Sequence, residues 1–191
     1  MLKNEEDVIK IIRNDDKMME ILRVVNTLNL PDWWICAGFV RAKIWDTLHG
    51  YINRTQTPDV DVIYFDDKEI DESIEKSLEA RLHSVMPDIP WSVKNEARMH
   101  VVNHIEPYFS SVDAVSKFPE TATALGVKID ENDQLILTAP CGIEDVINME
   151  VKPTGFFTET KERAAIYEKR LKQKNWKSIW PKIKVYHFED L

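Results

Sequence analysis

The chain has 191 residues, of which 43% are hydrophobic and 30% are charged, and its formal net charge is -8 at neutral pH. This length and composition predict a single compact unit with a modest core. No run approaches the roughly 20 apolar residues that cross a bilayer, and no charged and then apolar leader opens the chain, so we expect a soluble, cytoplasmic protein with no membrane partner. The acidic balance also disfavours nucleic-acid binding by the chain as a whole.

The first 30 residues predict two helices without chemistry of their own. Their apolar residues recur at helical spacing in two sets, and Asn14-Asp15-Asp16 between the sets can cap the second helix. We expect a single domain over residues 1–191, in which residues 1–30 form a helical brace, residues 33–153 the core, and residues 154–191 a basic C-terminal extension.

A short strand, a glycine and a helix come next. Trp33–Ala37 is apolar and predicts a buried strand, Gly38 interrupts it, and Phe39–Leu48 has apolar residues at helical spacing. Cys36 lies in the strand and is expected to behave as a small buried hydrophobe. Cys141 is far from it in the chain, and neither cysteine has a nearby Cys or His at metal-ligand spacing, so neither indicates a disulfide, a zinc site or a thiol nucleophile.

The most informative pattern is Asp59-Val60-Asp61, because its two acids precede the apolar run Val62–Phe65 instead of following it. Side chains alternate along a strand, so Asp59 and Asp61 share a face and lie close enough to hold a divalent cation. Haloacid-dehalogenase-type phosphatases and many sugar-nucleotide glycosyltransferases carry such a pair at the end of a buried strand. The polar, proline-containing segment Thr55–Pro58 disfavours that arrangement, because it cannot be the inside of a central strand.

A helix over Asp71–Val85 and a strand over Trp91–Ala97 are predicted after the acid pair. Alternation along this strand places Asn95 on one face and Glu96 on the other. If Glu96 faces the aspartates, an acidic triad is complete. If Asn95 does, the third ligand is neutral and the metal site is weaker. The sequence leaves both alternatives open.

The segment beyond this strand predicts a hairpin and a short helix. Val127–Ile129 and Gln134–Thr138 are apolar runs on either side of the polar turn Asp130–Asp133, which is the pattern of two antiparallel strands. Gly142–Ile147 then predicts a short helix whose acids suit the positive end of the helix dipole.

The C-terminal region is the basic part of the chain. Residues 159–184 contain nine Lys and Arg against three Glu, whereas residues 59–79 contain nine acids against two Lys. One interpretation makes a helix over Glu159–Asn175 a cradle for an anionic substrate, with Trp176 and Trp180 as stacking surfaces. The other, which we favour, is a solvated amphipathic helix that buries both tryptophans and one apolar face in the core. That face comprises Ala164, Ala165, Ile166 and Leu171.

Five separated blocks of the sequence occur in an informative order: AGFVRAKIWDTLHGY, TPDVDVIYFDD, WSVKNEARMHVVN, FPETATALGV and APCGIEDV. Together they resemble a family of small bacterial nucleotidyltransferase-like proteins within the DNA polymerase β-like nucleotidyltransferase superfamily, over roughly Trp33–Pro153. The resemblance implies an α+β fold with a small mixed sheet of the nucleotidyltransferase type. Helices flank that sheet, and the chain adds N-terminal helices and a C-terminal basic helix.

The resemblance also implies a metal-dependent nucleotidyltransferase. Such an enzyme moves a nucleoside monophosphate from a nucleoside triphosphate to an acceptor, here an unidentified small molecule, protein or RNA end. Asp59 and Asp61 would be the catalytic residues and would hold Mg²⁺ or Mn²⁺. Glu96 would be a third metal ligand, with Asn95 as its alternative.

The phosphates of the nucleotide are expected at the start of the helix that follows the glycine. The superfamily usually places serine after the glycine, but Phe39 follows Gly38 here, so phosphate binding must rely on backbone amides and on Arg41 one turn later. Arg98 is a further candidate phosphate contact. The missing serine and the open third ligand support an alternative function, an inactive nucleotidyltransferase-fold regulator, antitoxin-like, that binds a nucleotide or a protein. A structure without a third acid near the aspartates would favour that alternative.

Overall fold

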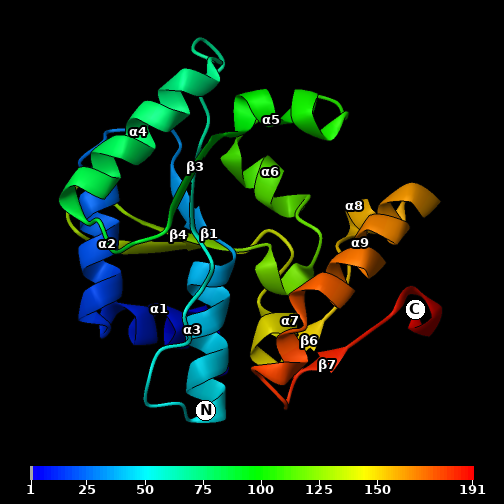
Figure 1. Cartoon of the computed structure of the whole chain (residues 1–191). Coiled ribbons are helices and arrows are strands. Elements are labelled where there is room, and N and C mark those ends of the chain that lie inside the picture. The colour runs from blue at the N-terminus through cyan, green and yellow to red at the C-terminus, as the bar shows by residue number, and fades with distance from the viewer. Residues whose placement is uncertain (1) are drawn as a thin grey trace.

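A computed structural model describes residues 2–191 and contains one five-stranded mixed sheet (Figure 1). Its strand order is β3-β2-β1-β4-β5, in which β2 and β3 are parallel and the other neighbours antiparallel. The strands are β1 (Trp34–Cys36), β2 (Val60–Tyr64), β3 (Trp91–Asn95), β4 (Gly126–Ile129) and β5 (Leu135–Thr138). The predicted α+β class with a small mixed sheet is confirmed.

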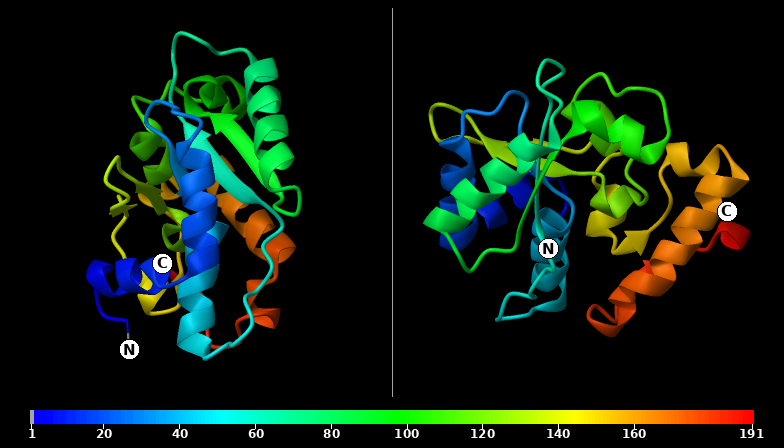
Figure 2. Two further views of the ribbon diagram at one scale, coloured as in Figure 1. Left: turned by 90° about the vertical axis from the view of Figure 1, so that its left-hand side faces the viewer. Right: turned by 45° about the horizontal axis from the view of Figure 1, so that its top comes forward.

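Helices flank this sheet, and α3 separates two groups of them. The right-hand view of Figure 2 shows α2 (blue) and α4 on one side of α3 (cyan), and α9 (orange) on the other. Within residues 2–191 no helix is long and apolar enough to cross a membrane. The helices are α1 (Glu5–Arg13), α2 (Asp16–Asn26), α3 (Gly38–His49), α4 (Glu72–Val85), α5 (Glu96–Asn103), α6 (Ser111–Ser116), α7 (Glu144–Ile147), α8 (Gly155–Thr158) and α9 (Lys161–Lys174), with 3-10 turns η1 (Thr121–Thr123), η2 (Trp176–Ser178) and η3 (Phe188–Asp190).

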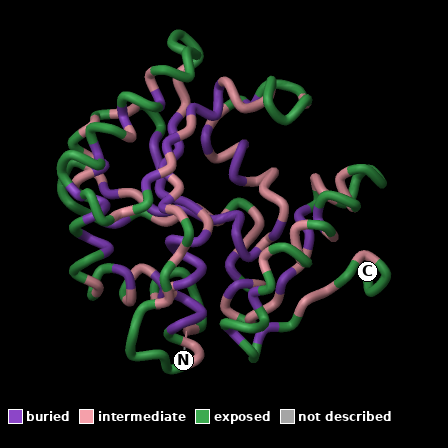
Figure 3. Tube along the Cα trace, viewed as in Figure 1, coloured by how far each residue is buried: buried purple, intermediate pink, exposed green. Residues whose placement is uncertain are grey.

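The two faces of the sheet have different surroundings. Val62 and Val93 belong to the main core, which they form with helices α1 to α4. Cys36 and Ile63 belong to a second apolar cluster that packs against α6. Asp61 stands two residues before Ile63 and therefore shares this second face. Figure 3 shows that buried residues concentrate in the strands and in α3.

The two helices predicted for the first part of the chain are present as α1 and α2. Val8 and Ile12 of α1 are fully buried in the main core. Asp15 caps α2, since its side chain accepts a hydrogen bond from the Met18 backbone N–H, which confirms the predicted cap. Cys36 is fully buried, and burial raises the pKa of its thiol, as expected for a small buried hydrophobe.

The C-terminal region is attached to the rest of the protein by tryptophans and by a second sheet. Trp176 and Trp180 are buried, and the Trp180 indole N–H donates a hydrogen bond to Asp46 of α3 at 2.8 Å. The second sheet pairs β6 (Glu150–Val151) with β7 (Lys184–Val185). Both tryptophans therefore belong to the core, as we favoured from the sequence.

Helix α9 buries a different face from the predicted one. Ala165 and Ile166 are exposed, Ile166 at 54%. Tyr167 is fully buried instead, and its hydroxyl lies within hydrogen-bonding distance of the backbone carbonyls of Val151 and Tyr186. The prediction that Ala165 and Ile166 pack inward is wrong, because the buried tyrosine needs these polar partners and their position sets the rotation of the helix.

Candidate active site

The aspartate pair lies at the start of β2, where the chain enters the sheet. Asp59 immediately precedes the strand and Asp61 is its second residue, so both side chains lie on the same face. They line one cavity of about 120 Å³ together with Gly38 and Arg41. The structure thus brings together four of the residues that the sequence singled out.

The turn between β1 and α3 carries the unusual backbone conformation at this cavity. Ala37 has φ 54° and ψ -118°, close to the first central residue of a type II′ turn, a position that glycine usually takes. A Cβ added to Gly38 would lie 3.5 Å from Thr57 Cγ2 and 3.6 Å from an Arg41 guanidinium nitrogen. The glycine therefore leaves open the space between the turn, Thr57 and Arg41. Strain at Ala37 is of the kind that clusters at functional sites.

The first turn of α3 offers backbone amides to this cavity, because Gly38 begins the helix and lines the cavity. Free N–H groups at a helix start favour anions. Phe39 does not line this cavity, and its side chain is 1% exposed and belongs to the main core. The expectation that backbone amides replace the missing serine hydroxyl stays a prediction.

Arg41 is held among aromatic rings at the edge of the cavity. It is 6% exposed, and its guanidinium carbon lies 4.3 Å from the centroid of the Trp176 ring, 5.2 Å from that of Trp45 and 5.6 Å from that of Trp180. Its buried Nε has no hydrogen-bond partner within residues 2–191. Burial lowers the pKa of Arg41 to about 10, so the side chain keeps its charge at neutral pH. A buried cation with a free donor is prepared for an anionic ligand.

Two further cations reach the cavity from α9. Arg170 and Lys174 both line it. Arg170 also donates from Nε to the Glu120 carboxylate at 2.5 Å, and Glu120 is fully buried. The basic helix is therefore packed onto the core and also brings two cations to the cavity of the aspartates.

Asp61 has an altered affinity for its proton. Burial raises its pKa to about 6, and the charge of Asp59 adds to this effect, while Lys174, Arg170 and Arg41 oppose it. Two ionised carboxylates in this cavity repel each other, and a cation between them would remove that repulsion. The pair therefore fits an oxygen-preferring divalent cation.

The predicted acidic triad is not assembled. Within residues 2–191 no three His, Cys, Asp or Glu side chains gather where they could hold a metal ion. Strand β3 ends at Asn95, and Glu96 begins α5, which leads it away from the cavity and into a different hollow. Burial raises the pKa of Glu96 to about 8, with smaller contributions from Glu75 and Asp61. The expectation that Glu96 completes the metal site needs this correction, because the end of the strand redirects the side chain.

Asn95, the alternative third ligand, is occupied by the fold. Its register partner is Tyr64, and its side-chain oxygen accepts hydrogen bonds from the backbone N–H groups of Asp66 and Ala97. Its amide nitrogen donates to the carbonyls of Asp66 and Glu69. These bonds use the side chain to anchor the loop after β2 and to cap α5, so the expectation of a metal-ligating Asn95 is not supported.

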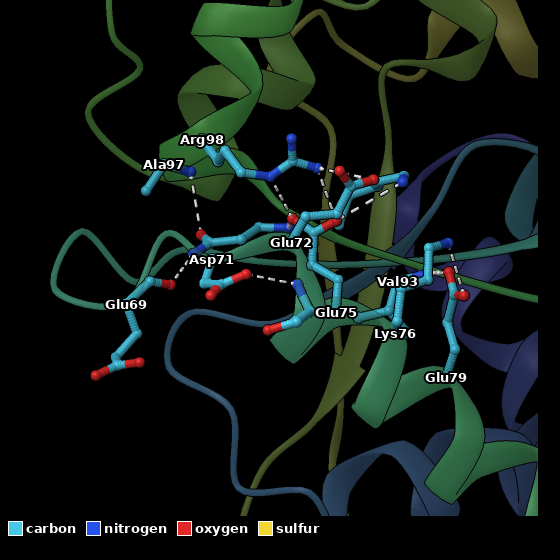
Figure 4. A network of polar contacts seen from close by, with 12 residues as sticks. Glu69, Asp71, Glu72, Glu75, Lys76, Glu79, Val93, Ala97 and Arg98 are labelled. Carbon is cyan, nitrogen blue, oxygen red and sulfur yellow. Dashed lines mark hydrogen bonds and ion pairs between the residues drawn. The ribbon is translucent and has the colours of Figure 1, made fainter.

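Arg98 lies in an ion-pair network outside the cavity (Figure 4). Its guanidinium donates to both carboxylate oxygens of the fully buried Glu75, at 3.0 and 2.9 Å, and lies 3.8 Å from Glu72. The predicted phosphate contact by Arg98 is therefore also corrected, because the buried carboxylate takes up the guanidinium.

A family model described as a nucleotidyltransferase matches residues 23–185 of the chain. The chain belongs to this nucleotidyltransferase family. The resemblance inferred from the sequence blocks is confirmed, and with it nucleotidyl transfer as the general activity. No curated protein matches this nucleotidyltransferase.

Solved structures share this fold, and the chain spans 43% of the length of two of them. This nucleotidyltransferase aligns with an NMR structure described as a CCA-adding enzyme head domain, at a TM-score of 0.88 and 35% identity, covering 98% of each chain. A CCA-adding enzyme with ATP aligns at a TM-score of 0.53 and 11% identity, over 94% of this chain and 43% of that one. An apo CCA-adding enzyme aligns at a TM-score of 0.54 and 12% identity, over 95% of this chain and 43% of that one. The last two similarities show the fold alone.

Sequence reasoning missed three residues of this nucleotidyltransferase site. The sequence does not reveal the unusual backbone conformation of Ala37, because these backbone angles follow from the packing of the turn. Arg170 and Lys174 lay within a basic segment that the sequence did mark. The four-residue spacing of this pair places both on one face of a helix and is the signal that could have singled them out.

Proposed function

We propose that this nucleotidyltransferase moves a nucleoside monophosphate from a nucleoside triphosphate to an acceptor hydroxyl or phosphate, with Asp59 and Asp61 as the catalytic pair. The observation that carries this proposal is the cavity itself. It joins two carboxylates to three cationic side chains and to the start of α3. The three cations are Arg41, Arg170 and Lys174.

The cationic residues suit the triphosphate. Its negative charge is balanced by Arg41, Arg170 and Lys174, and the amides at the start of α3 add donors for phosphate oxygens. Arg41 keeps a free Nε donor for this purpose. Because Trp176 stacks on the guanidinium, Arg41 is already oriented before the substrate binds.

The aspartates suit Mg²⁺ or Mn²⁺. Two carboxylates rarely bind Mg²⁺ tightly by themselves, and substrate phosphates usually complete its ligands. Burial and then the charge of Asp59 raise the pKa of Asp61, and such an ion would relieve the repulsion between the two carboxylates. When bound, the metal supplies charge neutralisation at the reacting phosphate and activation of the acceptor oxygen.

The transfer itself exchanges one bond to phosphorus for another. An acceptor oxygen forms a new bond to the α-phosphorus, and the bond between that phosphorus and the oxygen that bridges it to the β-phosphorus breaks, so pyrophosphate leaves. A hydroxyl acceptor releases its proton to solvent. Arg41, Arg170 and Lys174 stabilise the charge that gathers on the leaving pyrophosphate.

A second candidate is a non-catalytic regulator of the same fold, antitoxin-like, that binds a nucleotide or a protein. The specific observation in its favour is the missing third carboxylate, since no three acidic, histidine or cysteine side chains gather at a metal-binding distance within residues 2–191. Phe39 in the place of the usual serine points the same way.

A screen of labelled nucleoside triphosphates against small-molecule, protein and RNA acceptors, with Mg²⁺ and with Mn²⁺, tests the proposal. We expect transfer of label by the wild-type protein and by an Asp67→Asn control, which changes an exposed acid outside the cavity. We expect none from Asp61→Asn. If the wild type binds nucleotide but transfers no label to any acceptor, the regulator is the better description.

A further inference from the structure

Asp46 of α3 has a buried carboxylate to which the proposed reaction gives no role. The residue is 5% exposed and does not line the cavity of the aspartates. Its Oδ2 accepts a hydrogen bond from the Thr55 backbone N–H at 2.8 Å. Its Oδ1 accepts from the Thr55 hydroxyl at 2.7 Å and from the Trp180 indole N–H at 2.8 Å. These bonds offset the cost of burying the carboxylate, and they join α3 to two different parts of the chain.

Thr55 begins the segment that leads into the aspartate pair. Residues 56–58 follow it and line the cavity beside the two aspartates. Residues 56–59 make no hydrogen bond to any of residues 2–191. The next bond along the chain is made by the Val60 N–H, at the start of β2. The bonds of Thr55 to Asp46 therefore fix one end of this wall of the cavity, and the start of β2 fixes the other end.

Trp180 belongs to the cationic part of the cavity. It lines the cavity together with Trp176. The centroids of the two rings lie 5.6 and 4.3 Å from the guanidinium carbon of Arg41. Helix α9, which carries the other two cations of the cavity, ends two residues before Trp176. The bond from Trp180 to Asp46 therefore holds the segment that places the cations.

Other contacts also join this C-terminal segment to the end of α3 and to the turn after it. The Tyr51 hydroxyl donates to the Ile179 carbonyl at 2.6 Å, and the Lys182 N–H donates to His49 Nε2 at 3.1 Å. They should keep the segment attached when the bond to Asp46 is lost. Both lie at exposed positions, where water competes for the same groups, so the buried bond restricts the position of the segment more closely.

We propose that Asp46 is a positioning residue, which fixes the aspartates and the cations of the cavity relative to each other. This inference rests on the proposed nucleotidyl transfer, because it concerns the spacing between the metal and the triphosphate of that reaction. Asp46 does not touch the substrate. It acts on the acids through Thr55 and on the cations through Trp180. A misplacement of about 1 Å in such a site can lower the rate of a reaction about a hundredfold.

Binding of inorganic tripolyphosphate measures the two parts of the cavity separately. This probe resembles the phosphates of the nucleotide and requires no particular base or acceptor. Its affinity without metal reports the cations, and the increase in affinity on addition of Mg²⁺ reports the aspartates. Calorimetry of the full chain measures both quantities.

Three variants change the bonds of Asp46. Thr55→Val removes the hydroxyl donor and should reduce the Mg²⁺-dependent increase in affinity. Trp180→Phe removes the indole donor and should reduce the affinity without metal. Asp46→Asn offers one acceptor oxygen instead of two and should reduce both quantities. Each reduction should be about fivefold, because that is the effect of one hydrogen bond of ordinary strength on an equilibrium.

Trp91→Phe is the matched control. It also removes a buried indole hydrogen bond, from Trp91 to the Met86 carbonyl at 3.1 Å, but outside the cavity. It should lower the melting temperature about as much as Trp180→Phe and leave both quantities unchanged. If Asp46→Asn does not fold, Thr55→Val and Trp180→Phe decide the test, because each of them keeps the carboxylate.

Two results would overturn the positioning role of Asp46 alone. One is a wild-type protein that binds the probe together with Thr55→Val and Trp180→Phe variants that bind it equally well, since Asp46 would then only fasten the fold. The other is an equal loss of affinity in Trp91→Phe, since reduced stability would then explain the effect. No binding of the probe by the wild type, with or without Mg²⁺, would contradict the proposed function itself and remove the inference that rests on it.

Discussion

Two groups of buried charges lie at the ends of neighbouring strands, and they differ in how well they are paired. At the end of β3, the carboxylate of Glu75 accepts hydrogen bonds from Arg98 (Figure 4). It also accepts one from the Asn95 backbone N–H. At the start of β2, Asp61 has a pKa raised to about 6, and the buried Nε of Arg41 has no partner within residues 2–191. The first group is paired within the fold, whereas under the proposed function the second group is left free for a ligand.

The largest effect should come from removing the unpaired acids. Asp59→Ala and Asp61→Ala should each lower nucleotidyl transfer on the order of a thousandfold, because metal-supported charge stabilisation is worth several kcal/mol. The melting temperature should stay nearly unchanged or rise, since each change relieves the repulsion between the two carboxylates. Turnover and calorimetric melting measure both. Loss of activity together with a large loss of stability would give the acids a structural role.

Breaking the pair of Arg98 and Glu75 should have the opposite effect, because it should lower the stability of the protein and leave its affinity for nucleotide unchanged. Arg98→Ala leaves the fully buried Glu75 without its cation and should lower the free energy of unfolding by about 3 to 5 kcal/mol. Urea unfolding measures this loss, and Lys76→Ala, which removes an exposed cation from α4, should stay within about 0.5 kcal/mol of wild type. Affinity for nucleotide in the folded protein should not change. A weaker affinity with unchanged stability would restore Arg98 as a phosphate contact.

Removing the charge of Arg41 should weaken the binding of a nucleoside triphosphate without a similar loss of folding stability. Arg41→Met keeps a long apolar side chain among the tryptophans but deletes the charge. A charge-assisted hydrogen bond to phosphate is worth about 1.5 to 3 kcal/mol, so calorimetry should show affinity for a non-hydrolysable triphosphate reduced about ten- to a hundredfold. Arg81→Met, at an exposed position of α4, serves as the control. Equal affinities in the two variants would remove Arg41 from the phosphate site.

The smallest effect concerns pH. Because the pKa of Asp61 is about 6 in the folded protein against 3.8 normally, the folded state binds the proton more tightly. Asp61 therefore lowers stability as pH rises from about 4 to about 6, by about 1 to 2 kcal/mol once partial exposure is taken into account. Urea unfolding at several pH values should show this decline in wild type and a flatter profile in Asp61→Asn. If stability changed with pH in the same way in wild type and in Asp61→Asn, the pKa of Asp61 would lie at its usual value of 3.8.

The amino-acid sequence by itself determined the elements around the aspartates and one half of the candidate site. Alternation along β2 is enough to place Asp59 and Asp61 on one face, and the glycine after an apolar strand locates the start of α3. These features are local, since they depend on residues within a few positions of each other. The same local reasoning identified Arg41, which lies one turn into that helix.

The tertiary structure decided which charged side chains find partners. Arg98 and Glu75 are 23 residues apart, and Arg170 and Glu120 are 50 apart, so neither pair has a periodic signature in the chain. Whether Glu96 completes the metal site depended on where β3 ends and α5 begins, a boundary set by the hydrogen bonds of Asn95 to a distant loop. A residue's type and spacing indicate the chemistry available to it, but long-range packing determines whether that chemistry is used for folding or left free for a substrate.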